Sequence, residues 1–496
     1  YLYSNFLDRY LAMKYQEDDF VEIPIKEMKS RLHAHQSQIP DYLSFGIRMV
    51  AVLFILYMFF TRLFSFKEDF LRFREKRESK FTPFSNLMKF HDSIFEVANV
   101  KEGIIEFPKS LAHKKVDCLF DFVIIGSGPG GSVSAKKLQE AGFKVCLIES
   151  GNIQKEDNIS PFSYNEMLSK YKHAGISTTF GNANITYVEG ATFGGGSEIN
   201  SGLYHRTPDE ILSYWGKKYK LVDADSDKME KYFKIIEQDL CISHFPKGQI
   251  PRASLVLEDG ANKLGWEVQE VPRWFKYNNS QSSSGIKMTM TQTYLKNYLE
   301  NGGLVYEFSK AKSLKFYKKK WNINFNTLKG ESTISSKNVI LSAGTIGTPQ
   351  LLRLSNLSRK AGKRFQMHPT IKVVALFDKD VNQKSMGVPV HQVKEFAPDI
   401  SFGCSISSKP YLRVAMLDYP AQKGLVDKKW EKMAIYYAMI TPTGNGSIIN
   451  LPYFEDPLTS YKLSERDKNN LAKGLKKLSQ LLISAGAKEL YPSIKG

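Results

Sequence analysis

The feature that most limits how this chain can fold is a glycine-rich turn between an apolar strand and a helix. Residues 121–126 read DFVIIG, and Ser-Gly-Pro-Gly-Gly follows up to Gly131. Gly126, Gly128 and Gly131 match the spacing G-x-G-x-x-G. The first glycine permits a tight turn, the second lets the backbone approach a pyrophosphate, and the third lets helix and strand pack closely. We expect a helix over about 132–141 whose N-terminal amides face the phosphates.

An acidic residue follows the turn at a distance that suits nucleotide binding. Residues 144–148 read as a second strand, and Glu149 closes it 18 positions after Gly131. A carboxylate there accepts hydrogen bonds from ribose hydroxyls and argues against a 2′-phosphate. Glycines also serve plain turns and close packing, and this pattern alone does not separate FAD from NAD.

Two later segments bear on the choice of cofactor. Residues 190–202 read GATFGGGSEINSG, and three successive glycines fit a backbone that passes close to a flat ligand. Residues 341–352 read LSAGTIGTPQLL. Here we expect the strand 338–342 to end in a glycine turn, followed by a helix with Thr348 as its cap and Pro349 in first position. An ordinary glycine loop and an ordinary strand-to-helix junction are the alternatives.

Together these motifs resemble the glucose–methanol–choline (GMC) oxidoreductase family, in their order as well as their residues. The resemblance covers residues 118–496. It departs from the family pattern at Ala191, where a basic residue is usual, and at Asn356, where glycine is usual. Residues 365–369, which read FQMHP, and the helical N-terminal extension are most similar to the long-chain fatty alcohol oxidases.

The resemblance implies an α/β fold in which a Rossmann-like FAD-binding domain is interleaved with an α+β substrate domain. The implied FAD-binding domain comprises 118–207 and 285–358, and the substrate domain 208–284 and 359–496. From the spacing of apolar residues, we expect residues 1–117 to be a helical N-terminal region. The implied FAD-binding residues are Gly126, Ser127, Gly128, Gly130, Gly131, Glu149, Gly194, Gly195, Gly196, Ser197, Asn200, Ser201, Gly202, Lys312 and Gly344. Among them, Glu149 would bind the adenosine ribose, residues 194–200 would lie along the isoalloxazine ring, and 311–313 would meet the adenine.

By the same resemblance, the protein oxidises an alcohol by hydride transfer to flavin, with O2 or a quinone or cytochrome as electron acceptor. The family's catalytic base is a histidine near the C-terminus, whereas the last histidine here is His391. Both ends of the chain look cut, so we expect the base beyond Gly496 and assign no catalytic residue. His205 and His368 lie in family-like segments, and a structural role is our expectation for both.

The most apolar run of the chain lies near its start. Residues 49–61 are uncharged and would make about 20 Å of helix, against a hydrocarbon core of about 30 Å. A buried or interfacial helix is therefore our first expectation, and a membrane span is the second. Seven basic residues between Arg62 and Lys80, against three between Met28 and Arg48, would place the flavin domain of a membrane-bound protein in the cytosol. A cytoplasmic protein is the alternative.

Composition narrows the classes of function that remain possible. The net charge of +18 is spread over the chain, apart from the 62–80 cluster and the run of Lys318, Lys319 and Lys320, and no nucleic-acid-binding motif accompanies either. None of the four cysteines forms a C-x-x-C pair, so we expect no metal site and a reducing compartment. Neither a G-x-S-x-G elbow nor a phosphate-loop motif occurs. A nicotinamide-dependent dehydrogenase and a non-catalytic flavin-binding protein remain as alternatives to the flavin enzyme.

Overall fold

A computed structural model gives the fold of most of the chain. It describes residues 7–8, 10–11, 25–36, 39–61, 119–151, 163–175, 177–246, 248–277, 285–383 and 387–494. The basic cluster at 62–80 and Cys118 lie outside these residues.

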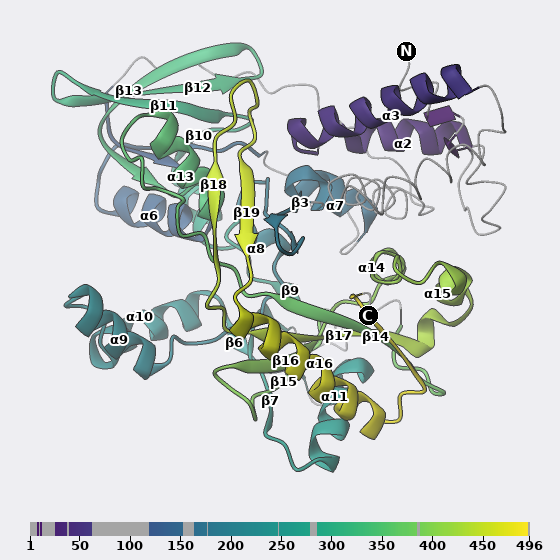
Figure 1. Cartoon of the computed structure of the whole chain (residues 1–496). Helices are drawn as coiled ribbons and strands as arrows, with labels where there is room; N and C mark the ends of the chain where they lie inside the picture. Colours follow the sequence, from purple (N-terminus) through teal and green to yellow (C-terminus); the bar gives the residue numbers. More distant parts are fainter. Residues whose placement is uncertain are drawn as a thin grey trace.

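The first sheet carries the glycine turns and combines four parallel strands with an antiparallel meander (Figure 1). Its order is β10-β2-β1-β13-β12-β11. The strands are β1 (Leu119–Ile125), β2 (Val145–Ile148), β10 (Leu304–Tyr306), β11 (Lys310–Tyr317), β12 (Lys320–Thr327) and β13 (Gly330–Leu341). Phe122 of β1 lies in register with Val145 on one side and Asn338 on the other. Because β1, β2 and β13 are parallel, their C-terminal ends meet at one edge of the sheet.

Both faces of this sheet are covered, as the apolar sequence of β1 predicts for a buried parallel strand. On one face, Ile124 and Leu147 pack against helices α6 (Pro129–Glu140) and α12 (Tyr294–Glu300). On the other, Val123 and Cys146 pack against the meander and against Leu351 of α13 (Gly344–Leu354). The helix predicted after the first glycine turn is confirmed, although it begins three residues earlier than expected, with Pro129 in its first turn.

The second sheet is antiparallel and has the order β20-β14-β17-β16-β15-β7. Its strands are β7 (Val268–Glu270), β14 (Thr370–Leu376), β15 (His391–Val393), β16 (Ile400–Cys404), β17 (Met433–Ile440) and β20 (Glu489–Pro492). One face packs against α11 (Arg252–Lys263) and α16 (Glu465–Ser484), and the other against α14 (Lys409–Ala415) and α15 (Lys423–Lys429). Ser464 and Asp467 form a capping box that fixes the start of α16.

Residues 208–284 divide their packing between the two sheets. Helix α11 and strand β7 join the second sheet, whereas Leu240, Ile242 and Trp274 pack into the core beneath α6. Helices α9 (Asp209–Tyr219) and α10 (Ser226–Asp239) precede them. Pro208 stands at the cap of α9 and provides no side-chain hydrogen bond to the helix. The short strands β6 (Ile242–Ser243), β8 (Arg273–Lys276) and β9 (Ile286–Lys287) form a small sheet of their own.

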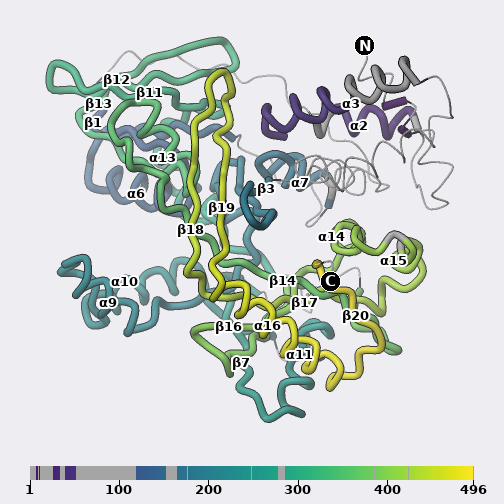
Figure 2. The backbone as a smooth tube through the Cα atoms, viewed as in Figure 1, coloured from purple at the N-terminus to yellow at the C-terminus, as the bar shows by residue number. Residues whose placement is uncertain are grey.

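A long hairpin connects the two halves of the molecule. Strands β18 (Asn445–Ile449) and β19 (Leu458–Lys462) run from the second sheet past the first, and β19 pairs with β4 (Phe180–Gly181) (Figure 2). The turn of this hairpin therefore reaches the edge of the first sheet, although its residues lie more than a hundred positions after β13 in the sequence.

Two helices of the N-terminal region are described, α2 (Ile25–Gln36) and α3 (Asp41–Thr61). The start of α3 packs on the hairpin turn: the rings of Tyr42 and Phe45 both contact Phe454, and Glu455 donates its backbone N–H to Asp41. Leu43, Ile47 and Ala51 are buried. In the described part of the chain, no helix has both the length and the apolar character needed to cross a membrane.

A candidate cofactor site at the ends of the parallel strands

A cavity of about 1640 Å³ opens at the C-terminal edge of the first sheet. Its floor is formed where the three parallel strands end: Ile125 and Gly126 at the end of β1, Ile148 and Glu149 at the end of β2, and Ser342 and Ala343 just after β13. Ligands of open α/β sheets bind at this edge. The cavity exceeds the 300–1,000 Å³ of ordinary ligand pockets, so it has room for a dinucleotide.

The three glycines of the first turn serve two different purposes. A Cβ atom on Gly126 would lie 2.2 Å from the backbone oxygen of Ser342, and one on Gly131 would lie 1.9 Å from that of Gly126. Gly131 therefore lets α6 pack against the end of β1, and Gly126 lets the turn pack against the residue that follows β13. A Cβ on Gly128 would meet nothing within 4 Å, because this residue faces the cavity. Gly128 also caps α6 and has no side chain that could accept a hydrogen bond from the first turn of that helix. Backbone amides and the helix dipole are therefore open to an anion.

Glu149 lies at the cavity edge and is bonded to the first turn. One carboxylate oxygen, Oε2, accepts from the backbone N–H (2.8 Å) and hydroxyl (2.7 Å) of Ser127. The other, Oε1, accepts from the N–H of Gly151 (2.7 Å) and the hydroxyl of Ser150 (3.1 Å). Only 6% of Glu149 is exposed. This residue thus fixes the conformation of the turn in addition to lining the cavity.

The second glycine segment forms the opposing wall of the cavity. Gly194 and Gly195 have φ of +90° and +56°, which favours glycine. Gly194 donates its N–H to the Ser127 hydroxyl (3.0 Å) and accepts from the Ser197 hydroxyl (2.8 Å). Helix α8 (Gly196–Ile199) then starts. Ser127 and Ser197 therefore hold the two glycine segments in place from behind the cavity wall.

Charged groups lie where the second segment leaves the cavity. Lys287 donates to the backbone oxygen of Glu198 (2.9 Å), and Glu198 accepts from the hydroxyl of Thr291 (2.9 Å). Burial lowers the pKa of Lys287 to about 8, although the charge of Glu198 opposes this shift. Burial likewise raises the pKa of Glu198. The two residues tie the second glycine segment to β9.

The structure places eight of the fifteen residues expected from the sequence on the cavity. These are Gly126, Gly128, Glu149, Gly195, Gly196, Asn200, Lys312 and Gly344. The other seven are not part of its lining: Ser127, Gly130, Gly131, Gly194, Ser197, Ser201 and Gly202. Several of these support the lining residues instead, as the bonds of Ser127 and Ser197 show. Gly202 leaves room for the ring of Phe275, which a Cβ atom would approach to 2.5 Å.

Helix α13 begins earlier than the sequence predicts. We expected Thr348 as the cap and Pro349 in first position, but the helix starts at Gly344 and contains Pro349 in its interior. Gly344 has φ of +77°, which lets the chain turn directly from β13 into the helix. As a result Gly344, Thr345 and Gly347 line the cavity, and a second helix N-terminus faces it.

The far end of the cavity is closed by the hairpin turn. Lys310, Ala311 and Lys312 line the cavity at the start of β11, where the family resemblance expects the adenine. Glu455 pairs with Lys312 (2.7 Å) and Lys310 (3.6 Å). The β18–β19 turn therefore contributes to this site together with the first sheet.

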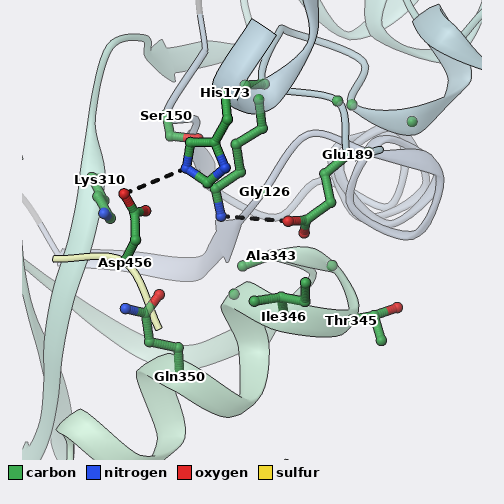
Figure 3. A pocket seen from close by; sticks show the side chains of 18 of the residues that line it. Gly126, Ser150, His173, Glu189, Lys310, Ala343, Thr345, Ile346, Gln350 and Asp456 are labelled. Carbon is green, nitrogen blue, oxygen red and sulfur yellow. Dashed lines mark ion pairs between the residues drawn. The ribbon is translucent and has the colours of Figure 1, made fainter. Parts of the chain in front are cut away.

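His173 and Asp456 form a pair at the cavity that motif analysis did not identify. The imidazole Nε2 lies 3.4 Å from a carboxylate oxygen of Asp456, and Nδ1 lies 2.8 Å from the Ser177 hydroxyl. A second ion pair, between Lys172 and Glu189, lies beside it (Figure 3). Burial lowers the pKa of His173, so the ring is neutral at neutral pH. Burial alone would raise the pKa of Asp456, but its bond to His173 and nearby lysines lower it.

The two histidines considered from the sequence lie in different places. His368 is exposed and lines the large cavity. His205 lines a separate cavity of about 390 Å³ together with Tyr204 and Glu237, where burial and Lys394 lower its pKa. The described residues contain no group of three or more side chains that could hold a metal ion.

Comparison with known proteins decides the family. The family model described as GMC oxidoreductase matches residues 120–370, just over half of the chain. A GMC-type oxidoreductase of Sinorhizobium fredii, itself uncharacterized, is 31% identical over 388 residues, which cover 76% of this chain and 77% of that one. The chain is a GMC oxidoreductase.

More distant relatives of this GMC oxidoreductase act on different compounds. A long-chain-alcohol oxidase of Arabidopsis thaliana is 26% identical over 427 residues; the chain spans only 57% of its length. Two solved structures share the fold alone. Pyridoxine 4-oxidase from Mesorbium loti is 16% identical, with a TM-score of 0.57 and coverage of 75% of this chain and 82% of that one. A formate oxidase of Aspergillus oryzae is 13% identical, with a TM-score of 0.59 and coverage of 76% and 84%.

The cofactor of this GMC oxidoreductase is FAD, and the cavity fits it. The space beyond Gly128 and the two open helix ends suit a pyrophosphate, and the volume of the cavity accommodates a dinucleotide. Bound FAD would supply hydride-accepting redox chemistry, while the protein supplies orientation and electrostatics. Family membership sets aside the nicotinamide-dependent alternative.

Proposed function

We propose that this GMC oxidoreductase oxidises a long-chain or otherwise apolar alcohol to an aldehyde or ketone. The observation that carries the flavin chemistry is the cavity formed by both glycine segments at the ends of β1, β2 and β13. The preference for a long-chain alcohol is supported by the similarity to the plant long-chain-alcohol oxidases, at 24–26% identity.

We further propose that the base that removes the hydroxyl proton lies beyond residue 496. His173 is bonded to Asp456 and Ser177, which suits a structural role. His368 is exposed on the cavity wall and is the alternative base. General-base catalysis typically contributes about 10²–10⁴-fold, so its absence from a shortened polypeptide would leave very slow oxidation.

Flavin reduction under anaerobic conditions tests the substrate class. The FAD-loaded protein from the longest available reading frame is mixed with primary alcohols of increasing chain length, and loss of flavin absorbance is followed. We expect faster reduction by long-chain than by short-chain alcohols. Formate and pyridoxine serve as comparison substrates, because the two structural relatives are named as oxidases of these compounds. Flavin reduction by either of these compounds but not by alcohols would contradict the proposal.

The same assay tests the position of the base. The 496-residue polypeptide should reduce its flavin at least about 10²-fold more slowly than a longer gene product. Equal rates would place the base within residues 1–496, and His368→Gln would then show whether His368 is that base. Reoxidation of the reduced flavin by O2, compared with a soluble quinone, distinguishes an oxidase from a dehydrogenase.

Membrane association, with the flavin domain in the cytosol, is our proposal for localisation. The basic residues that follow the apolar run 49–61 support it. Fractionation of cells that express the protein separates this proposal from a cytoplasmic location.

A further inference from the structure

We propose that the β11–β12 hairpin of the flavin domain docks on an anionic phospholipid surface. The end of this hairpin, residues 315–321, reads KFYKKKW and contains four lysines, three aromatic residues and no acid. We call it the basic hairpin. The proposal concerns a surface away from the cofactor cavity and does not depend on the identity of the substrate.

The surrounding strands carry a strong excess of positive charge. Residues 310–341, which span the whole meander, contain eight lysines and one acidic residue, Glu331. Lys310 and Lys312 pair with Glu455, and Lys337 pairs with Asp121. In the described part of the chain, no ion pair is found for the remaining five, which are Lys315, Lys318, Lys319, Lys320 and Lys329. Such a surface attracts anionic lipid headgroups.

The aromatic residues of the basic hairpin stay largely exposed, although Phe316 packs on Trp321 across the hairpin and Lys318 lies over the ring of Tyr317. Phe316 is 57% exposed and Tyr317 is 55% exposed. They are adjacent on one strand and therefore project from opposite faces of the hairpin. Amphipathic aromatic side chains next to lysines are typical of proteins that sit at the membrane–water interface.

The backbone conformation of the turn also supports the proposal. Lys318 and Lys319 occupy its two central positions, with φ of +50° and +61°. A two-residue turn of this kind favours Asn-Gly or Gly-Gly, because other residues are strained at positive φ. Two lysines therefore make the turn less stable than Asn-Gly would, and they place two charges at its tip.

Protection of a sheet edge is the simplest competing explanation, since β11 is the edge strand of the first sheet. Lysines on an edge strand prevent pairing with other chains. That explanation accounts for the lysines but does not require the exposed Phe316 and Tyr317 beside them, even with Phe316 packed on Trp321 across the hairpin. The meander also lies at the same upper end of the molecule as α3, whereas the second sheet lies at the opposite end (Figure 1). A single lipid surface could therefore contact both the basic hairpin and the N-terminal region.

Sedimentation with vesicles tests the proposal on the whole 496-residue chain. Vesicles of phosphatidylcholine alone are compared with vesicles that also contain phosphatidylserine, and the readout is the binding that depends on phosphatidylserine. The variant Lys318→Asn/Lys319→Gly replaces two charges with residues that suit the turn. We expect its Tm to be equal or higher and its phosphatidylserine-dependent binding to be about 30-fold weaker, since each lysine near the surface contributes about fivefold.

Two further variants identify which property of the hairpin causes any loss of vesicle binding. Phe316→Ser/Tyr317→Ser should weaken binding at low and high salt alike, whereas the effect of the lysines should fade at high salt. The control Lys473→Gln/Lys476→Gln removes two exposed charges from α16, at the other end of the molecule, and should leave binding unchanged.

Three results would overturn the proposal. The first is equal binding to both kinds of vesicle, and the second is an equal loss in the α16 control, which would indicate a general effect of charge. The third is binding of the basic hairpin to heparin or single-stranded RNA without binding to vesicles, which would make it a site for another polyanion.

Discussion

Gly195 lies against Gly128, so close that a Cβ atom on Gly195 would stand 2.9 Å from the Gly128 Cα. The two residues belong to different glycine segments, and each lines the cofactor cavity. Their backbones therefore form one continuous wall, which leaves no room for a side chain between the segments. The glycines at these two positions serve the same site for different reasons: Gly195 allows the contact, and Gly128 leaves space for the ligand.

Substitution at Gly128 should abolish FAD binding without unfolding the protein. In Gly128→Val, the side chain enters the space that we assign to the pyrophosphate, where no protein atom lies within 4 Å of a Cβ. We expect loss of flavin from the purified protein and little change in the Tm of the flavin-free form. Full flavin occupancy in this variant would show that the pyrophosphate lies elsewhere.

Gly131→Ala provides the matched comparison, because its Cβ would lie 1.9 Å from the backbone oxygen of Gly126. Helix α6 would have to move away from β1, which we expect to destabilise the flavin-free protein by about 1–3 kcal/mol. Urea unfolding of the two flavin-free variants measures the difference. Equal stability of Gly128→Val and Gly131→Ala would contradict the separate roles of these glycines.

Substitution of Glu149 should affect both cofactor affinity and stability. Each of its carboxylate oxygens accepts a backbone N–H, one from Ser127 and one from Gly151. The amide of Glu149→Gln would have to direct an NH2 group at one of these donors, so we expect both Gln and Ala to destabilise the flavin-free protein by about 1–3 kcal/mol. FAD affinity should fall roughly ten- to a hundredfold.

Fluorescence titration with FAD and urea unfolding measure the two effects of Glu149 separately. A role confined to the ribose would lower affinity in both variants and leave the flavin-free stability unchanged. The sequence suggested that Glu149 affects cofactor affinity alone. Its hydrogen bonds to the first turn indicate that it also affects the stability of the flavin-free protein.

The sequence predicted the cofactor site to the extent that the site is made of local motifs. The spacing of Gly126, Gly128 and Gly131 depends on one strand, one turn and one helix, and all three are present, with the helix starting three residues earlier than predicted. The start of α13 was predicted wrongly, because the preference of proline for a first turn was outweighed by the positive φ of Gly344. A local rule fails there because a neighbouring residue already provides the turn.

Contacts between distant segments could not be predicted in this way. His173 and Asp456 are 283 positions apart, and neither lies in a recognisable motif. They meet because the β18–β19 hairpin extends from the second sheet to the first. The same hairpin brings Glu455 to Lys312, so part of the cofactor cavity depends on the tertiary arrangement alone.

The His173–Asp456 pair should make stability depend on pH. Because burial lowers the pKa of His173 below its usual 6.5, the unfolded chain takes up a proton before the folded protein does. The stability associated with the neutral ring is therefore complete above pH 6.5 and is lost as the pH falls below it. Urea unfolding of flavin-free protein between pH 7.5 and 5, at about half-unit steps, measures the slope.

His173→Gln should flatten this pH dependence by at most one proton, or about 1.4 kcal/mol per pH unit. Asp456→Ala should lower stability at every pH in this range, because it removes the acceptor for the ring. Parallel slopes in the wild-type protein and His173→Gln would show that other groups cause the pH dependence.

Removal of the N-terminal region should destabilise the protein. Tyr42 and Phe45 of α3 cover Phe454 in the hairpin turn, and Asp41 accepts the backbone N–H of Glu455. Deletion of residues 1–80 exposes this turn beside the cofactor cavity. We therefore expect aggregation or a lower Tm together with weaker FAD binding, as a packed helix predicts, whereas a pure membrane anchor would leave a soluble and fully folded protein.

Point substitutions separate the contact itself from the loss of a whole segment. Tyr42→Ala/Phe45→Ala removes both rings that contact Phe454, while Met49→Ala changes an exposed residue of the same helix and serves as the control. Loss of two aromatic contacts of about 0.5–1.5 kcal/mol each, in addition to the buried area, should lower stability by more than 1 kcal/mol. If the double variant and Met49→Ala unfold at the same urea concentration and bind FAD equally well, α3 does not support the hairpin turn, and its role lies at the membrane.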